Sequence, residues 1–171
     1  VVWTKLLPAL QAKTSGALAA DAAGQEKLRE KLAGLVLKLP TMIEAPALAK
    51  TVAGKKYVFP KNPQAIDAIT LTPAGDDGRT TEIAVVIDGA EQRVAVSGRD
   101  WVRGDLNTGP SAGQVAVAGG WTAADTFTLD MVRYRTPFTA RYRLIFSGDE
   151  LKVETKPNVG PTPPVMVGKR G

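Results

Sequence analysis

The side chains best suited to chemistry in this chain are a short run of arginines. Arg133, Arg135, Arg141 and Arg143 lie close together, and residues 131–148 contain no acid. A guanidinium group binds carboxylate or phosphate oxygens through paired N–H donors. The cluster therefore indicates an anionic ligand, unless the side chains only extend to water and cover apolar neighbours.

Strand alternation divides this cluster into two pairs. Arg141 and Arg143 fall on the polar face, where one of them is predicted to pair with Asp130. The other two share the parity of the apolar face but lie at the strand end, where they would line the mouth of a barrel. The predicted anion or ligand site consists of Arg133, Arg135 and Tyr142.

Several kinds of catalytic and metal site are excluded by composition. The chain contains no cysteine and no histidine. It therefore has no disulfide, no thiolate, no histidine base and no histidine metal ligand. Ser-x-x-Lys and Tyr-x-Asn motifs are also absent. We predict no catalytic, metal or cofactor site in this chain.

Three short motifs are too weak to assign a function. Residues 13–16 (KTSG) are similar to the Lys-Thr-Gly strand of penicillin-recognising enzymes but precede a predicted helix. Residues 103–105 (RGD) spell an adhesion tripeptide of a length that recurs by chance. Residues 76–78 (DDG) are too few for a calcium loop.

Residues 114–155 predict four consecutive β-strands, because apolar and polar side chains alternate along them. Turn-forming residues at 122–125, 136–137 and 147–150 separate the strands. The residues of the apolar face are Val115, Val117 and Trp121; Phe127, Leu129 and Met131; Phe138, Ala140, Tyr142, Leu144 and Phe146; Leu151 and Val153.

Residues opposite each other in an antiparallel hairpin share a face, and this parity sets the register. The first turn pairs Trp121 with Phe127, and the last turn pairs Phe146 with Leu151. The same registers place Val117 opposite Met131 and Leu144 opposite Val153.

The middle turn leaves two registers open. A two-residue turn at 136–137 pairs Met131 with Tyr142, whereas a four-residue loop at 134–137 pairs Leu129 with Tyr142. We favour the longer loop, because proline cannot adopt the positive φ of a type I′ turn.

The remaining sequence suggests the domain organisation. Residues 1–20 are interpreted as the end of a preceding domain and a linker, and residues 21–40 as an amphipathic helix capped by Asp21 and ended by Pro40. Residues 55–155 are predicted to form the β-structure, and residues 156–171 an extended tail rich in Pro and Gly. The residues on the apolar face of the helix are Leu28, Leu32, Leu35, Val36 and Leu39.

Hairpins without helical crossovers predict an antiparallel fold. We read loops at 41–54 and 101–113, and about eight strands. These favour a mainly β protein, an eight-stranded up-and-down antiparallel barrel preceded by one helix that plugs or flanks it. A β-sandwich is the alternative.

Charge and hydropathy limit the partners. The net charge of +5 is read as a solubilising surface. No apolar run approaches the ~20 residues of a membrane helix. Aromatic residues are not interleaved with the basic ones, which disfavours nucleic acid as a partner. The first residue is Val1 and no signal-peptide pattern follows it, so we expect that the native N-terminus lies further upstream.

Several short segments resemble one known family. They are residues 119–127 (GGWTAADTF), 136–139 (TPFT), 146–151 (FSGDEL), 2–9 (VWTKLLPA), 32–35 (LAGL) and 158–162 (NVGPT). The chain resembles the C-terminal lipocalin-like domain of serine hydrolases related to class C β-lactamases and D-alanyl-D-alanine carboxypeptidases. It departs from that family at Arg135, where relatives often carry an acid.

The resemblance implies a lipocalin-like barrel that packs on, or shapes access to, a catalytic serine hydrolase domain of the same polypeptide. It also implies a bacterial periplasm or cell envelope. The chain itself would not be an enzyme, because none of the family's catalytic motifs is present.

Two functions remain open: an accessory domain of a hydrolase, or a barrel that binds a small amphiphile. Large inward residues would fill a small barrel, so we expect the first. The apolar segment 1–10 is also expected to mediate self-association.

Overall fold

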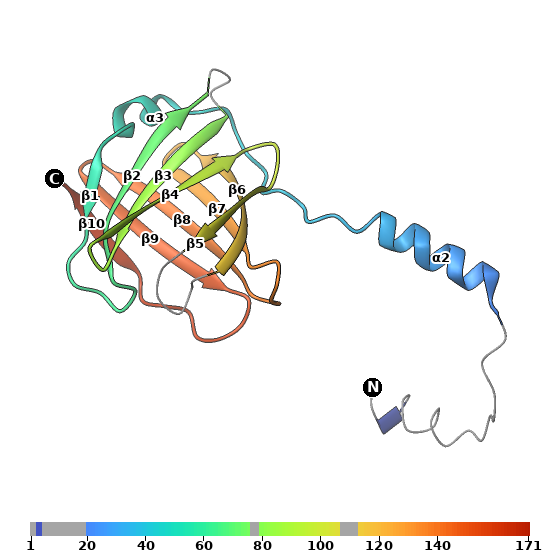
Figure 1. Ribbon diagram of the computed structural model, residues 1–171. Helices are drawn as coiled ribbons and strands as arrows, with labels where there is room; N and C mark the ends of the chain where they lie inside the picture. The colour runs from blue at the N-terminus through green and yellow to red at the C-terminus, as the bar shows by residue number, and fades with distance from the viewer. Residues whose placement is uncertain (1–2, 5–19, 76–78, 107–112) are drawn as a thin grey trace. The chain divides into compact units, whose positions relative to one another are not determined.

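The computed structural model of the protein describes residues 3–4, 20–75, 79–106 and 113–171. The chain divides into two compact units, residues 1–37 and 38–171. The second unit is a β-barrel (Figure 1). The predicted self-association segment 1–10 lies, apart from Trp3 and Thr4, outside the described residues, as do residues 13–16 and 76–78.

The described residues contain ten strands in one antiparallel sheet, ordered β4-β3-β2-β1-β10-β9-β8-β7-β6-β5. Every strand pairs with its neighbour in sequence except β4 with β5, and β1 also pairs with β10, so the sheet curls round until β4 contacts β5 and β6. The strands are β1 (Lys56–Val58), β2 (Ile66–Ala74), β3 (Thr80–Ile87), β4 (Ala90–Ser97), β5 (Val102–Leu106), β6 (Gly113–Ala123), β7 (Thr126–Val132), β8 (Thr139–Ser147), β9 (Glu150–Pro157) and β10 (Met166–Arg170).

The registers predicted from parity are confirmed. Trp121 pairs with Phe127 and Val117 with Met131. The middle hairpin adopts the longer-loop register, in which Tyr142 lies opposite Leu129. The last hairpin also has its predicted pairs, Phe146 with Leu151 and Leu144 with Val153.

The barrel is mainly β and nearly closed, as predicted, but it has ten strands rather than eight. Both missed strands lie where a polar loop or extended tail was expected. In β5 the charged Arg103 and Asp105 alternate with small or apolar residues and conceal the strand. In β10 only Met166 and Gly168 are buried, so five residues give too weak a pattern. Each of these strands forms because the edge of an adjacent strand presents unpaired backbone N–H and C=O groups.

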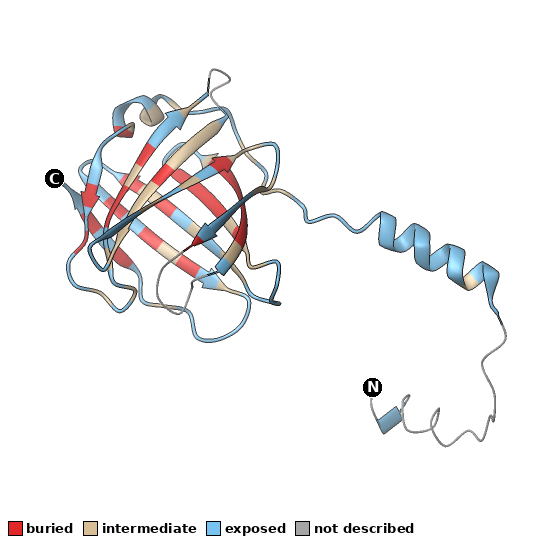
Figure 2. Cartoon of the chain, viewed as in Figure 1, coloured by how far each residue is buried: buried red, intermediate tan, exposed pale blue. Residues whose placement is uncertain are grey.

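Helix α2 (Ala22–Ala33) is shorter than the predicted helix. Asp21 caps it as expected, since its carboxylate accepts a hydrogen bond from the Gly24 N–H at 2.8 Å. The helix ends at its C-cap Gly34 instead of continuing to Leu39, which is consistent with the low helix propensity of glycine. No residue of α2 is buried (Figure 2).

Helix α3 (Ala47–Val52) lies where the sequence suggested only a loop. It precedes β1 and contributes Val52 to the core. The preceding segment, residues 39–46, is fastened to the barrel by the Ile43 N–H, which donates to the Trp121 carbonyl at 2.8 Å.

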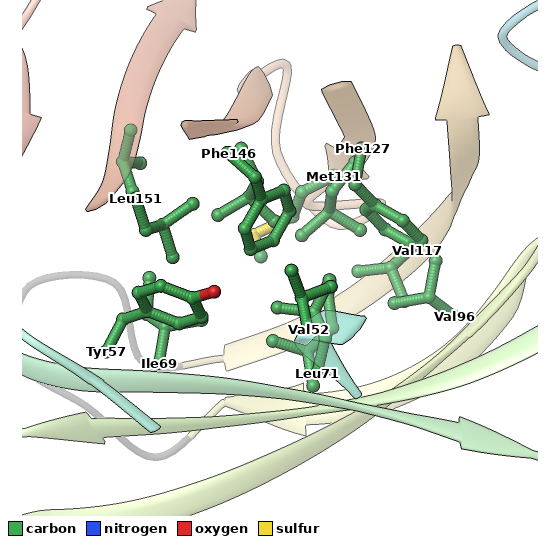
Figure 3. Packing of buried hydrophobic residues seen from close by; sticks show 14 of the residues in the cluster. Val52, Tyr57, Ile69, Leu71, Val96, Val117, Phe127, Met131, Phe146 and Leu151 are labelled. Carbon is green, nitrogen blue, oxygen red and sulfur yellow. The ribbon is translucent and has the colours of Figure 1, made fainter. Parts of the chain in front are cut away.

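The interior of the barrel is apolar, with the buried residues gathered on the inner side of the strands (Figure 2). At one level of this interior the aromatic side chains gather. Trp121 meets Phe127 edge-on at 5.7 Å between ring centroids and lies 5.6 Å from Phe146, which meets Tyr57 at 5.5 Å. Figure 3 shows Phe146 and Tyr57 close together within the wider core. This cluster fills one part of the barrel.

Candidate ligand-binding cavity

The two ends of the barrel differ in what fills them. One end, here the closed end, carries α3 and the β6–β7 and β8–β9 turns, and the aromatic cluster packs inside it. The other, the open end, carries the β1–β2, β3–β4 and β7–β8 connections. Phe138, predicted to point inward, lies in the β7–β8 connection and is 45% exposed. The large inward residues therefore do not fill the whole barrel.

A cavity of about 610 Å³ lies inside the barrel toward the open end. Aliphatic side chains form most of its wall. Its described lining residues are Pro63, Gln64, Ala65, Ile66, Ile69, Ile83, Val85, Ile87, Asp88, Ala90, Val94, Leu106, Leu129, Met131, Tyr142, Leu144 and Val153. Its volume lies within the range of about 300–1,000 Å³ that is usual for small-molecule sites.

Three polar side chains stand at or beside this wall. The Gln64 Nε2 atom is buried and has no hydrogen-bond partner. The Thr155 hydroxyl is buried and unpartnered as well, and Thr155 lies directly opposite Tyr142 in the β8–β9 register. Burial raises the pKa of the Tyr142 phenol, and the charge of Arg133 opposes this rise. These groups can hydrogen-bond a ligand in otherwise apolar surroundings.

The Gln64 position is set by the loop between β1 and β2, which is built around Asn62. The Asn62 amide group donates to the carbonyls of Pro60 and Ile66, and its oxygen accepts from the N–H groups of Gln64 and Ile66. The loop is joined to the β3–β4 turn by the Asp88 N–H, which donates to the Ala65 carbonyl at 2.9 Å. These hydrogen bonds hold the β1–β2 loop, on one side of the cavity mouth, in a fixed conformation.

Replacing Asn62 by alanine is expected to lower the free energy of unfolding by about 2 kcal/mol, because several partly buried backbone groups lose their partners at once. Denaturant unfolding of the variant measures this loss. Lys61→Ala, next to it and exposed, should change stability by no more than about 0.5 kcal/mol. Equal stability of the two variants would show that the loop does not depend on Asn62.

The structure separates the predicted site residues. Tyr142 lines the cavity, and Arg133 is half-buried at the end of β7, close enough to influence the Tyr142 pKa. Arg135 is exposed in the β7–β8 connection. Gln64 and Thr155 were missed: a loop glutamine gives no periodic signal, and the apolar alternation of β9 was followed only to Val153.

Both outward arginines are paired; strand parity predicted that one of them pairs with Asp130, and the pairing of the other with Glu154 was not predicted. Arg141 holds Asp130 with two hydrogen bonds, of 2.6 and 2.8 Å. Arg143 donates to Glu154 at 2.7 Å. These ion pairs are partly exposed to solvent, and each contributes about 0–1 kcal/mol.

A second hollow, of about 740 Å³, lies between residues 39–45 and the barrel, beside Arg79, Gly98 and Trp121. Although larger, it contains much less apolar surface than the barrel cavity. We therefore take the barrel cavity as the candidate site.

The part of the chain that the structure describes contains no cluster of acidic residues that could hold a metal ion. It also contains no helix long and apolar enough to span a membrane.

Solved structures with this architecture share its arrangement of strands. A fatty acid binding protein of Schistosoma mansoni in complex with arachidonic acid matches with a TM-score of 0.56 and 11% identity, over 71% of this chain and 96% of that chain. A fatty-acid-binding protein from Drosophila melanogaster brain matches with a TM-score of 0.54 and 12% identity, over 69% and 98%. The fold is that of the fatty-acid-binding proteins.

The same fold also occurs in a protein of a different name. Secretory abundant heat soluble protein 4 from Ramazzottius varieornatus matches with a TM-score of 0.52 and 7% identity, over 77% of this chain and 99% of that chain. No protein-family model matches this chain, and no curated protein does. At such low identity these similarities establish the fold alone.

Proposed function

We propose that the barrel binds a small amphiphile, with the apolar part of the ligand inside the cavity. The observation that carries this proposal is the aliphatic cavity of about 610 Å³ inside a barrel whose other end is closed by packed aromatic rings. Burial of apolar surface against such a wall contributes roughly 25 cal/mol per Å² before the costs of association are subtracted.

Two further features support this role. The β1–β2 loop at the cavity mouth is held by Asn62, so the cavity is preformed. Ligand binding therefore loses little free energy to the ordering of this loop. One structural neighbour is a fatty acid binding protein in complex with arachidonic acid. Binding of arachidonic acid is a property of that protein, and a ligand of this type fits a cavity of this kind.

A matched pair of variants on β3 tests the proposal. Val85 lines the cavity, whereas Val86 is not a lining residue and, as the next residue of the strand, lies on the opposite face of the sheet. Val85→Trp should fill the cavity and weaken ligand binding at least about tenfold. Val86→Trp should leave binding unchanged. Thermal unfolding confirms that both variants are folded.

Binding is measured by the fluorescence of two probes, uncharged prodan and anionic anilinonaphthalene sulfonate. Both probes are used so that the charge of the ligand does not decide the result. A wild-type protein that binds neither, or equal binding by the two variants, contradicts an internal site.

The accessory-domain role suggested by the sequence resemblance remains a separate prediction. An amphiphile-binding barrel and a catalytic serine hydrolase domain are compatible on one polypeptide. The exposed leucines of α2, Leu28 and Leu32, would suit packing against another domain, since each is 56% exposed.

A further inference from the structure

Two buried hydrogen-bonding groups at or beside the wall of the cavity have no partner: Gln64 lines the cavity, and Thr155 lies opposite the lining residue Tyr142 in the β8–β9 register. The unpartnered atoms are Gln64 Nε2 and the Thr155 hydroxyl oxygen. Such groups are rare in native proteins, and each costs about 1–3 kcal/mol when left unpaired. Apolar side chains of the same shape at these positions would avoid this cost. The polar atoms therefore point to a ligand that pairs with them.

The charges around the cavity restrict that ligand. Among its described lining residues there is no lysine or arginine, and the one carboxylate is Asp88, at the mouth. Arg141 and Arg143 are engaged on the outer face by Asp130 and Glu154. Arg133 lies at the strand end and is not a lining residue.

Away from the strand end, where Arg133 approaches Tyr142, an ionised head group inside this wall would lose its water without gaining a counter-ion from a lining residue. Burying an unpaired charge costs far more than burying a hydrogen-bonded neutral group. A neutral oxygen needs only donors, and the wall offers them. The Gln64 amide N–H group and the Tyr142 hydroxyl belong to lining residues, and the Thr155 hydroxyl lies beside them, opposite Tyr142; the hydroxyls can donate or accept.

We infer that the cavity selects an uncharged amphiphile, such as an alcohol, ester or amide, over an ionised one of equal chain length. Its oxygen hydrogen-bonds Gln64 or the Tyr142–Thr155 pair, and its chain lies along the aliphatic wall. This inference rests on the proposed function and specifies its ligand class.

Competition among chain-matched ligands tests the selection. Dodecanol, dodecanoate and dodecyltrimethylammonium are each titrated, below micelle formation, against prodan bound to the whole chain at neutral pH. Dodecanol is expected to displace the probe at about tenfold lower concentration than either ion, which is the discrimination expected for an unpaired buried charge.

Each other result is decisive. Equal displacement by all three ligands, or stronger displacement by dodecanoate, overturns the inference while leaving an amphiphile-binding barrel intact. If dodecanoate is the stronger ligand and Arg133→Gln abolishes that advantage, the mouth arginine is the head-group site instead. Absence of all binding contradicts the proposed function itself.

Near-isosteric variants separate a ligand contact from a structural role. Gln64→Met and Thr155→Val should weaken dodecanol several-fold, yet the thermal midpoint should stay equal or rise, because an unpartnered polar group is removed. Thr72→Val, the same exchange at an exposed position of β2, is the matched control and should leave binding unchanged. Unchanged dodecanol affinity in both Gln64→Met and Thr155→Val would overturn the assignment of these residues as ligand contacts.

Discussion

Trp121→Ala is expected to lower the free energy of unfolding by about 3–5 kcal/mol, the usual cost of emptying a buried aromatic site. Trp121 is 8% exposed and contacts two other rings, with centroids 5.7 Å from Phe127 and 5.6 Å from Phe146. Its removal leaves a hole in the aromatic cluster that closes one end of the barrel. Because neighbouring rings can relax only partly, the loss includes both transfer and cavity terms.

Trp3→Ala supplies the control for the same chemical change. Trp3 is 80% exposed, so the free energy of unfolding should change by no more than about 0.5 kcal/mol. Denaturant unfolding, followed by circular dichroism because both variants lose a fluorophore, compares the two. A loss below about 1 kcal/mol in Trp121→Ala would contradict the packing of this ring.

Gly119→Ala is expected to lower the free energy of unfolding by about 3 kcal/mol, at the upper end of overpacking effects. A Cβ at this position would lie 2.2 Å from the Thr128 carbonyl oxygen and 3.0 Å from the Leu129 Cα. Both are backbone atoms of the paired strand β7, so neither can move aside by rotating a side chain. The β6–β7 ladder must separate locally to admit one methyl group.

Two other glycines show how the cost of an added methyl group depends on what surrounds it. At Gly120 a Cβ would meet the Met42 Sδ at 2.7 Å, and this flexible side chain can rotate away, so Gly120→Ala should cost much less. At Gly104 nothing lies within 4 Å, and Gly104→Ala should be neutral or slightly stabilising. Unfolding free energies in any other order would contradict the close approach of β6 and β7 at Gly119.

The hairpin registers were predictable because they depend on local alternation. Side chains on a strand alternate with a period of two, so a slip of one residue would expose the whole apolar face. This constraint was enough to place Trp121 opposite Phe127, Leu129 opposite Tyr142 and an arginine opposite Asp130. It operates within adjacent hairpins and needs no knowledge of the rest of the fold.

The number of strands in the barrel was not predictable in the same way. Strand β5 contains Gly104 between charged residues, and β10 follows a proline-rich stretch, so neither has a strong intrinsic pattern. Each becomes a strand because edge groups of β6, or of β1 and β9, need hydrogen-bond partners. The strand number thus depends on contacts between distant segments.

The sequence by itself determined an antiparallel β-fold, its main registers and the absence of histidine and cysteine chemistry. Only the tertiary structure decided whether the interior is filled, because that depends on the level of each inward residue, that is, its position along the barrel axis. Trp121, Phe127 and Phe146 gather at one end with Tyr57, whereas aliphatic residues of β2, β3 and β4 surround the space at the other. The same distant contacts bring Gln64, from a loop held by Asn62, to the cavity that also includes Tyr142 of β8. Parity assigns a residue to a face, but the stagger of strands around a closed barrel assigns it to a level, and that stagger is a property of the whole sheet.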